Sequence, residues 1–110
     1  MKYNRIISKE KYRIMLTIEE IKRAVTKVGK KYGIKNAYLF GSYAKGEANS
    51  DSDVDLIVDK GDVHSFRKYF EMHEELEREL GTDVDLLTDK GIAPNFYDKI
   101  KNDRILIYAA

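Results

Sequence analysis

Two short segments of this chain alternate aspartate with apolar residues. Asp53 and Asp55 lie in SDVDLIV, and Asp83 and Asp85 lie in TDVDLLT. Because side chains alternate between the two faces of a strand, each pair would place both carboxylates on one face, with Cα atoms about 6.5 Å apart. The valine and leucine residues between them would face a core. This pattern predicts a site for cations or protons on an otherwise ordinary strand.

Paired carboxylates of this kind suit metal-assisted phosphate chemistry. Two like charges so close raise each other's affinity for a proton or a cation. Mg²⁺ binds a few carboxylates together with the phosphate oxygens of a substrate, and two such ions hold the attacking and leaving oxygens in nucleotidyl transfer. If the two segments form neighbouring strands, Asp85 approaches Asp53 and Asp55 and is the candidate general base for an attacking hydroxyl. Asp83 is the alternative third carboxylate.

The residues before the first aspartate pair suit contact with phosphate. Gly41 lets the backbone approach a ligand closely, because glycine has no side chain. Ser42 is predicted to begin a short helical turn that Gly46 closes, and the free N–H groups at such a start favour phosphate. Lys45 adds a positive charge. Tyr43, in the same loop, is a further candidate for contact with a nucleotide.

Helical periodicity predicts the elements that flank these segments. Thr17 and Glu20 form a capping box, and apolar residues follow at spacings of three and four as far as Tyr32. Asp62 is predicted to cap a long helix that Gly81 ends. The expected apolar face of this helix consists of Val63, Phe66, Phe70, His73, Leu76 and Leu80.

Strands are predicted over residues 37–40, 54–58 and 83–87. Pro94 suits the first turn of a last short helix, and residues 105–108 are an edge strand or a packed tail. This alternation indicates an α/β (α+β) fold, a small mixed β-sheet with helices packed on one face. The other face would be open and lined by the aspartates.

Length and composition limit the number of domains and the kinds of partner that the chain can have. The 110 residues suffice for one domain, and we interpret residues 1–16 as an N-terminal extension and residues 17–110 as a single domain. A formal net charge of +1 gives no basic field for direct nucleic acid binding. The absence of cysteine excludes disulfides and thiol catalysis. No apolar run spans a membrane, and no signal peptide is present, so we expect a cytoplasmic protein.

Two other interpretations account for the first aspartate pair. One is a charged, solvated surface strand, in which case the spacing and the third carboxylate are accidental. The other is a calcium loop, since DSDVD at residues 51–55 begins like an EF-hand. However, Leu56 stands where such a loop needs glycine, and Asp62 stands where it needs glutamate.

The stretch GSYAKGEANSDSDVDL, which begins at Gly41, resembles the signature of the DNA-polymerase-β-like nucleotidyltransferase superfamily: Gly-Ser, ten residues, then Asp-x-Asp. Residues 17–108 as a whole resemble the minimal nucleotidyltransferase (MNT) family, which includes the antitoxins of HEPN/MNT toxin–antitoxin systems. The resemblance implies a polymerase-β-like nucleotidyltransferase fold. It also implies Mg²⁺-dependent transfer of AMP from ATP to a hydroxyl acceptor.

The resemblance further implies roles for individual residues. Asp53, Asp55 and Asp85 would be catalytic and would bind the metal, two Mg²⁺ ions being expected, with Asp85 as base. Lys45 stands where the family commonly has arginine, so the charge is kept but two-point hydrogen bonding is lost. The nucleotide-binding residues would be Gly41, Ser42, Lys45 and Ser52.

A protein partner is implied in the same way. The acceptor would be a tyrosine of a HEPN-domain toxin, which adenylylation would neutralise. One alternative is a non-catalytic antitoxin that inhibits its toxin by contact and needs no metal site. Another is transfer to a small molecule such as an aminoglycoside, for which this chain has no acceptor-binding domain of its own. An oligomer is compatible with each of these functions.

Overall fold

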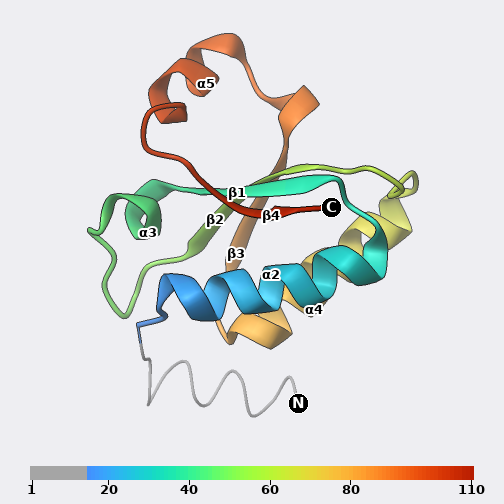
Figure 1. The fold of residues 1–110 in the computed structure, drawn as a ribbon, viewed down its shortest axis with the longest axis horizontal. Helices are drawn as coiled ribbons and strands as arrows, with labels where there is room; N and C mark the ends of the chain where they lie inside the picture. The colour runs from blue at the N-terminus through green and yellow to red at the C-terminus, as the bar shows by residue number, and fades with distance from the viewer. Residues whose placement is uncertain (1–14) are drawn as a thin grey trace.

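The predicted strands form one mixed sheet in the computed structural model, which describes residues 15–110 (Figure 1). The strand order is β3-β2-β1-β4, with β1 antiparallel to both of its neighbours and β2 parallel to β3. The expectation of a small mixed sheet is therefore confirmed, and residues 105–108 belong to an edge strand. The strands are β1 (Asn36–Phe40), β2 (Val54–Asp59), β3 (Val84–Thr88) and β4 (Ile105–Ala109).

Helices α2 (Ile18–Tyr32) and α4 (Phe66–Leu80) pack on one face of the sheet (Figure 1). The predicted capping box begins α2: the Glu20 N–H donates to the Thr17 hydroxyl at 3.1 Å, and the Thr17 N–H donates to the Glu20 carboxylate at 2.8 Å. These contacts satisfy backbone groups that a helix start leaves free. The main core lies between these helices and the sheet, and its fully buried side chains include Ile21, Val25, Val28, Leu39, Leu56, Val58 and Met72.

Helix α4 begins later than the sequence predicts. Its cap is Ser65, whose hydroxyl accepts a hydrogen bond from the Lys68 N–H at 3.1 Å, so the expected cap at Asp62 is wrong. The reason lies in Val63, whose side chain is buried at 1% exposure. A turn precedes the helix and places this side chain in the core. The turn is closed by a hydrogen bond of 2.9 Å from the Val63 N–H to the Lys60 carbonyl.

The buried face of α4 also differs from the expected one. Met72, Leu76 and Leu80 are buried, but Phe66 and Phe70 are 83% and 59% exposed. The predicted core positions of these two phenylalanines are therefore wrong. Because α4 packs along β3, one of the two edge strands of the sheet, the side chains on the outer flank of the helix project past the sheet into solvent.

The second face of the sheet is not fully open. Helix α5 (Pro94–Ile100), joined to β3 through the short helix η1 (Asp89–Gly91), lies on this side (Figure 1). A small cluster of Phe40, Ile57 and Ile100 is buried there, and the Phe96 ring packs edge-on against Phe40 with 5.7 Å between centroids. The carboxylates occupy the part of this face that α5 leaves uncovered, since Asp55 comes two residues before Ile57 on β2.

The described chain contacts the core before its first helix. Leu16 packs against the main core, and its N–H donates to the Tyr43 hydroxyl at 3.2 Å. Residues 1–14, most of the predicted N-terminal extension, lie outside the described residues, and the boundary at residue 17 stays a prediction. Of the helices between residues 15 and 110, none has the length and apolar character that crossing a membrane requires.

Candidate active site

The predicted carboxylates come from two neighbouring strands. In the parallel pair of β2 and β3, Asp55 and Asp85 are register partners, so their side chains stand next to each other on the same face of the sheet. Asp53 directly precedes β2 and shares the face of Asp55, because side chains alternate along the strand. The structure therefore supplies the adjacency on which the role predicted for Asp85 depends.

The charge state of Asp55 reflects these neighbours. Burial, followed by the negative charges of Asp85 and Asp53, raises the pKa of Asp55 to about 6. Asp55 is half-buried, whereas Asp53 and Asp85 are exposed. Asp83 is not among the charges that raise this pKa, and its backbone carbonyl accepts a hydrogen bond from the Val54 N–H at 3.0 Å. Asp85 is therefore the better choice for the third carboxylate.

These carboxylates fit a hard divalent cation by their chemistry. Within residues 15–110, no three acidic or histidine side chains are gathered closely enough to hold an ion as they stand. The donor set nevertheless consists of carboxylate oxygens, the ligands that Mg²⁺ prefers. Burial, followed by the charges of Asp85 and Asp53, raises the pKa of Asp55, and a bound cation would offset both effects.

Gly41 lies against the Asp55 carboxylate. It follows β1 directly, and Phe40, the last residue of β1, is the register partner of Asp55. The backbone of Gly41 has φ of +72°, and a Cβ atom at this position would collide with the Asp55 carboxylate oxygen. Glycine is thus required both by the left-handed backbone and by the close approach of the acidic group.

The predicted nucleotide-binding residues lie around the short helix α3 (Gly41–Lys45). Ser42 is half-buried at its start, and Lys45 is exposed at its end. The Ser52 hydroxyl accepts a hydrogen bond from the Asn49 N–H at 2.9 Å, which shapes the turn before β2. Tyr43, the further candidate for contact with a nucleotide, is 5% exposed and belongs to the main core.

Tyr69 on α4 holds the backbone next to Asp85. Its hydroxyl donates to the carbonyl of Leu86 at 2.7 Å. Burial and the negative charge of Asp85 raise the pKa of Tyr69, so the phenol retains the proton that it donates. No sequence motif points to Tyr69, and its contact with β3 comes from the tertiary structure.

Two further α4 side chains contact the same strand one residue before Asp85. Nε2 of His73 lies 2.6 Å from the Val84 carbonyl oxygen, and the Val84 N–H donates to the Glu77 carboxylate at 3.0 Å. With Tyr69, these residues recur at every fourth position, which places them on one face of the helix. They cap the free edge of β3 and fix the backbone on both sides of Asp85.

Comparison with known families and proteins agrees with this geometry. The model of the family described as polymerase beta, nucleotidyltransferase, matches residues 19–110. This match includes the three carboxylates of the candidate site and the Gly41-Ser42 pair that precedes them.

Individual proteins share sequence or fold with the chain. A Thermococcus cleftensis protein named protein adenylyltransferase MntA is 43% identical over 71 residues, which cover 61% of this chain and 72% of the relative. A Methanocaldococcus jannaschii protein, provisionally named a protein adenylyltransferase, is 39% identical over 90 residues, 82% of this chain and 97% of the relative. The same fold occurs in the solved structure of a tri-AMPylated Shewanella oneidensis HEPN toxin in complex with an MNT antitoxin. The TM-score is 0.65 at 19% sequence identity, and the match covers 86% of this chain and 74% of that chain.

Proposed function

The chain belongs to the polymerase beta nucleotidyltransferase family and is a nucleotidyltransferase, and from this premise we propose that it transfers AMP from ATP to a hydroxyl group of a protein with the help of Mg²⁺. The observation that carries the proposal is the register pairing of Asp55 with Asp85 beside Gly41. Paired carboxylates next to a glycine that admits close backbone approach suit a metal-bound triphosphate.

In this reaction, an acceptor oxygen forms a bond to the α-phosphorus of ATP, the bond from that phosphorus to the β-phosphate breaks, and pyrophosphate leaves. Mg²⁺, when bound by Asp53, Asp55 and Asp85, supplies positive charge next to the phosphate oxygens. Asp85 is exposed at the edge of the sheet, where it can accept the proton of the acceptor hydroxyl. We assign the triphosphate to the residues at the end of β1 and before β2, namely Gly41, Ser42, Lys45 and Ser52.

The acceptor that we propose is a tyrosine of a HEPN-domain toxin, so that the chain acts as an antitoxin in the cytoplasm. Two relatives carry the name protein adenylyltransferase. The solved complex with a similar fold contains a HEPN toxin that is itself AMPylated. The three carboxylates favour catalysis over inhibition by contact, because contact alone requires no cluster of repelling charges.

The test is incubation of the chain with labelled ATP, Mg²⁺ and a HEPN-domain toxin from the same genome. We expect label on a toxin tyrosine, located by mass spectrometry, and loss of toxin activity in parallel with labelling. Chelation of the metal should abolish the transfer, and calorimetry should show that ATP binds more weakly in EDTA. Neutralisation of the toxin without any transferred label would instead support inhibition by contact.

A further inference from the structure

An exposed group of aromatic side chains lies on α4, the helix that packs along β3, the strand that carries Asp85. Phe66 and Phe70 are 83% and 59% exposed, and their rings stack with 6.5 Å between centroids. Tyr69 packs edge-on against Phe70 at 6.1 Å. We call Phe66, Tyr69 and Phe70 the aromatic patch. Adjoining exposed aromatic rings of this kind are typical of sites where a partner binds.

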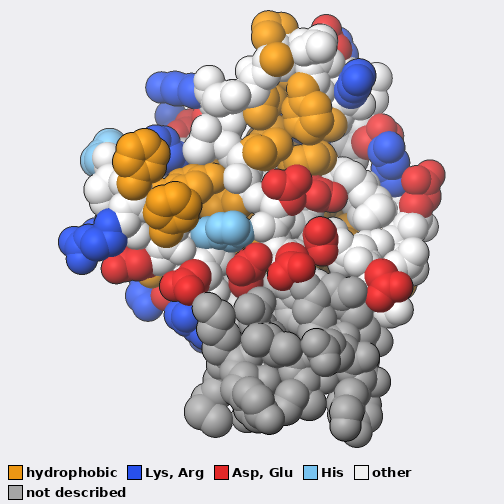
Figure 2. Space-filling view, turned by 180° about the vertical axis from the view of Figure 1, so that it is seen from behind, with side chains coloured by type: hydrophobic (Ala, Val, Ile, Leu, Met, Phe, Trp, Pro, Cys, Tyr) orange, Lys and Arg blue, Asp and Glu red, His pale blue; other side chains and the backbone are white. Residues whose placement is uncertain are grey.

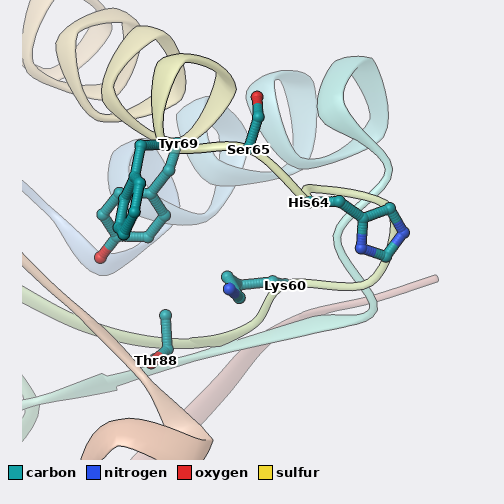
Figure 3. Close-up of a pocket in the computed structure, with 6 residues that line it drawn as sticks. Lys60, His64, Ser65, Tyr69 and Thr88 are labelled. Atoms are coloured by element: carbon teal, nitrogen blue, oxygen red, sulfur yellow. The ribbon is translucent and has the colours of Figure 1, made fainter.

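A cavity of about 310 Å³ opens beside the aromatic patch, between the start of α4 and the ends of β2 and β3. Figure 3 shows Lys60 extending toward the space between Tyr69 and Thr88, whereas His64 and Ser65 point away from it. Within residues 15–110, no carboxylate forms an ion pair with Lys60. The cavity thus combines an aromatic wall with a positive charge that lacks a counter-ion in the described chain.

The aromatic patch is connected to Asp85 through Tyr69. The Tyr69 hydroxyl contacts the Leu86 carbonyl at 2.7 Å, and Leu86 follows Asp85 directly. The Asp85 side chain lies on the face of the sheet opposite α4, but β3 is an edge strand. A bound segment can therefore pass around this edge from the patch to Asp85. Figure 2 shows exposed hydrophobic side chains and a group of acidic side chains on the same face of the molecule, with a histidine between them.

We propose that the aromatic patch and its cavity are the docking site for the protein that accepts AMP. The occupant is a segment of that protein with an apolar side chain for the patch and a carboxylate for Lys60, which places the acceptor hydroxyl at Asp85. This inference rests on the proposed function. The charges at the cavity favour an acidic segment, since Lys60 has no carboxylate partner among residues 15–110 and Lys68 in the first turn of α4 is exposed as well, whereas Arg67 pairs with Glu71 at 3.9 Å.

The test compares steady-state transfer to the HEPN-domain toxin by the wild-type chain and by the double variant Phe66→Ser/Phe70→Ser. Loss of two interface anchors should raise KM for the toxin by about tenfold or more. The value of kcat at saturating toxin and the affinity for ATP should stay within about twofold, because neither ring contacts the carboxylates. The matched control is Leu106→Ser on β4, which removes a side chain that is 49% exposed.

A charge reversal tests the proposed contact between Lys60 and a carboxylate of the acceptor protein. Lys60→Glu should also raise KM for the toxin, and the increase should shrink at high salt because ions screen the repulsion. Lys22→Glu, on the exposed side of α2, is the matched control and should leave KM unchanged. Thermal unfolding of each variant checks that the fold is intact, as expected for exposed positions.

Each outcome separates this inference from the proposed function. If the wild-type chain transfers AMP and the Phe66→Ser/Phe70→Ser variant does so with unchanged KM, the docking site is wrong and the enzyme assignment stands. If the wild-type chain labels no toxin, both fail. Sedimentation velocity tests whether a second copy of the chain covers the patch instead. If the wild-type chain is a dimer and the double variant is a monomer, a second copy covers the patch and the proposed docking site is wrong.

Discussion

Asp55 on β2 and Asp85 on β3 are register partners in a parallel strand pair, and burial together with the charge of Asp85 raises the pKa of Asp55. Two residues that are distant in the chain thus share one electrostatic environment. Their repulsion is a cost to the folded protein that a bound cation would offset. The first prediction follows from this pair.

Asp55→Asn should abolish nucleotidyl transfer and leave the fold intact. The substitution keeps the size of the side chain but removes a charge that a metal ion requires, and each ~1.4 kcal/mol of lost transition-state stabilisation lowers the rate tenfold. In EDTA the variant should melt slightly above the wild-type chain, because one of the repelling charges is gone. Labelled-ATP assays and thermal unfolding measure the two effects, and wild-type transfer by the folded variant would contradict a catalytic role for Asp55.

Gly41→Ala should reduce transfer more than Gly46→Ala. Both glycines have a positive φ, +72° and +73°, so each substitution should cost about 1 kcal/mol of stability from backbone strain. Only at Gly41 does the added Cβ collide with the Asp55 carboxylate, whereas no atom of residues 15–110 lies within 4 Å of a Cβ at Gly46. Unfolding in urea measures the backbone strain, and initial transfer rates measure the effect of the collision with Asp55. Equal transfer rates in the two variants would contradict a role for the close approach of Gly41 to Asp55.

Tyr69→Phe should lower kcat for transfer by about tenfold, while KM for ATP and for the acceptor remain unchanged. The variant keeps the ring but loses the hydrogen bond to the Leu86 carbonyl, so the backbone next to Asp85 is held less firmly. Tyr97→Phe is the matched control: its hydroxyl accepts from Arg104 at 3.1 Å, on α5. A change in KM rather than kcat would show that the Tyr69 hydroxyl binds the acceptor instead of positioning Asp85.

Glu75→Gln should destabilise the fold at neutral pH but not in acid. The Glu75 carboxylate joins the end of α2 to α4, since it accepts from Lys31 Nζ at 2.9 Å and from the Tyr32 hydroxyl at 3.0 Å. The hydrogen bond from Lys31 is the largest of the causes that lower the pKa of Glu75 below its usual value of 4.5. A lowered pKa gives stability above pH 4.5 that is lost as the pH falls through the folded-state value.

The difference in unfolding free energy between wild type and Glu75→Gln should therefore be about 1 kcal/mol at pH 7 and should disappear in acid. Denaturant unfolding at several pH values measures it. Glu79→Gln is the control, because the Lys27 partner of Glu79 is largely exposed at 68% and an exposed ion pair contributes little. A difference for Glu75→Gln that stays constant down to low pH would exclude its carboxylate charge as the cause.

Local patterns in the sequence were sufficient for much of the fold. Side-chain alternation placed the carboxylates of β2 and β3 on one face of each strand and the valines and leucines on the other. The capping box at Thr17 and the proline at the start of α5 identified two helix starts, because these signals depend on residues within one turn. The Gly-Ser and Asp-x-Asp spacing indicated the family, which the match over residues 19–110 confirmed.

Periodicity did not determine which flank of α4 faces solvent. Phe66 and Phe70 have core-like spacing, yet they are exposed because α4 packs along an edge strand and the sheet ends beneath it. Likewise, Ser65 rather than Asp62 caps the helix, because a turn at residues 60–63 buries the Val63 side chain before the helix begins. A local pattern shows that a face is apolar, but the amount of surface available to cover it depends on the rest of the fold.

The sequence by itself determined that Asp53, Asp55 and either Asp83 or Asp85 were available, and that they lay on or directly before two strands. Only the tertiary structure decided that β2 and β3 pair in parallel, with Asp55 opposite Asp85 and with Tyr69, His73 and Glu77 along the outer edge of β3. Alternation within a strand fixes the face on which a side chain lies, because it follows from backbone geometry. It does not fix the neighbouring strand or the register, which depend on how helices and strands from the whole chain pack together.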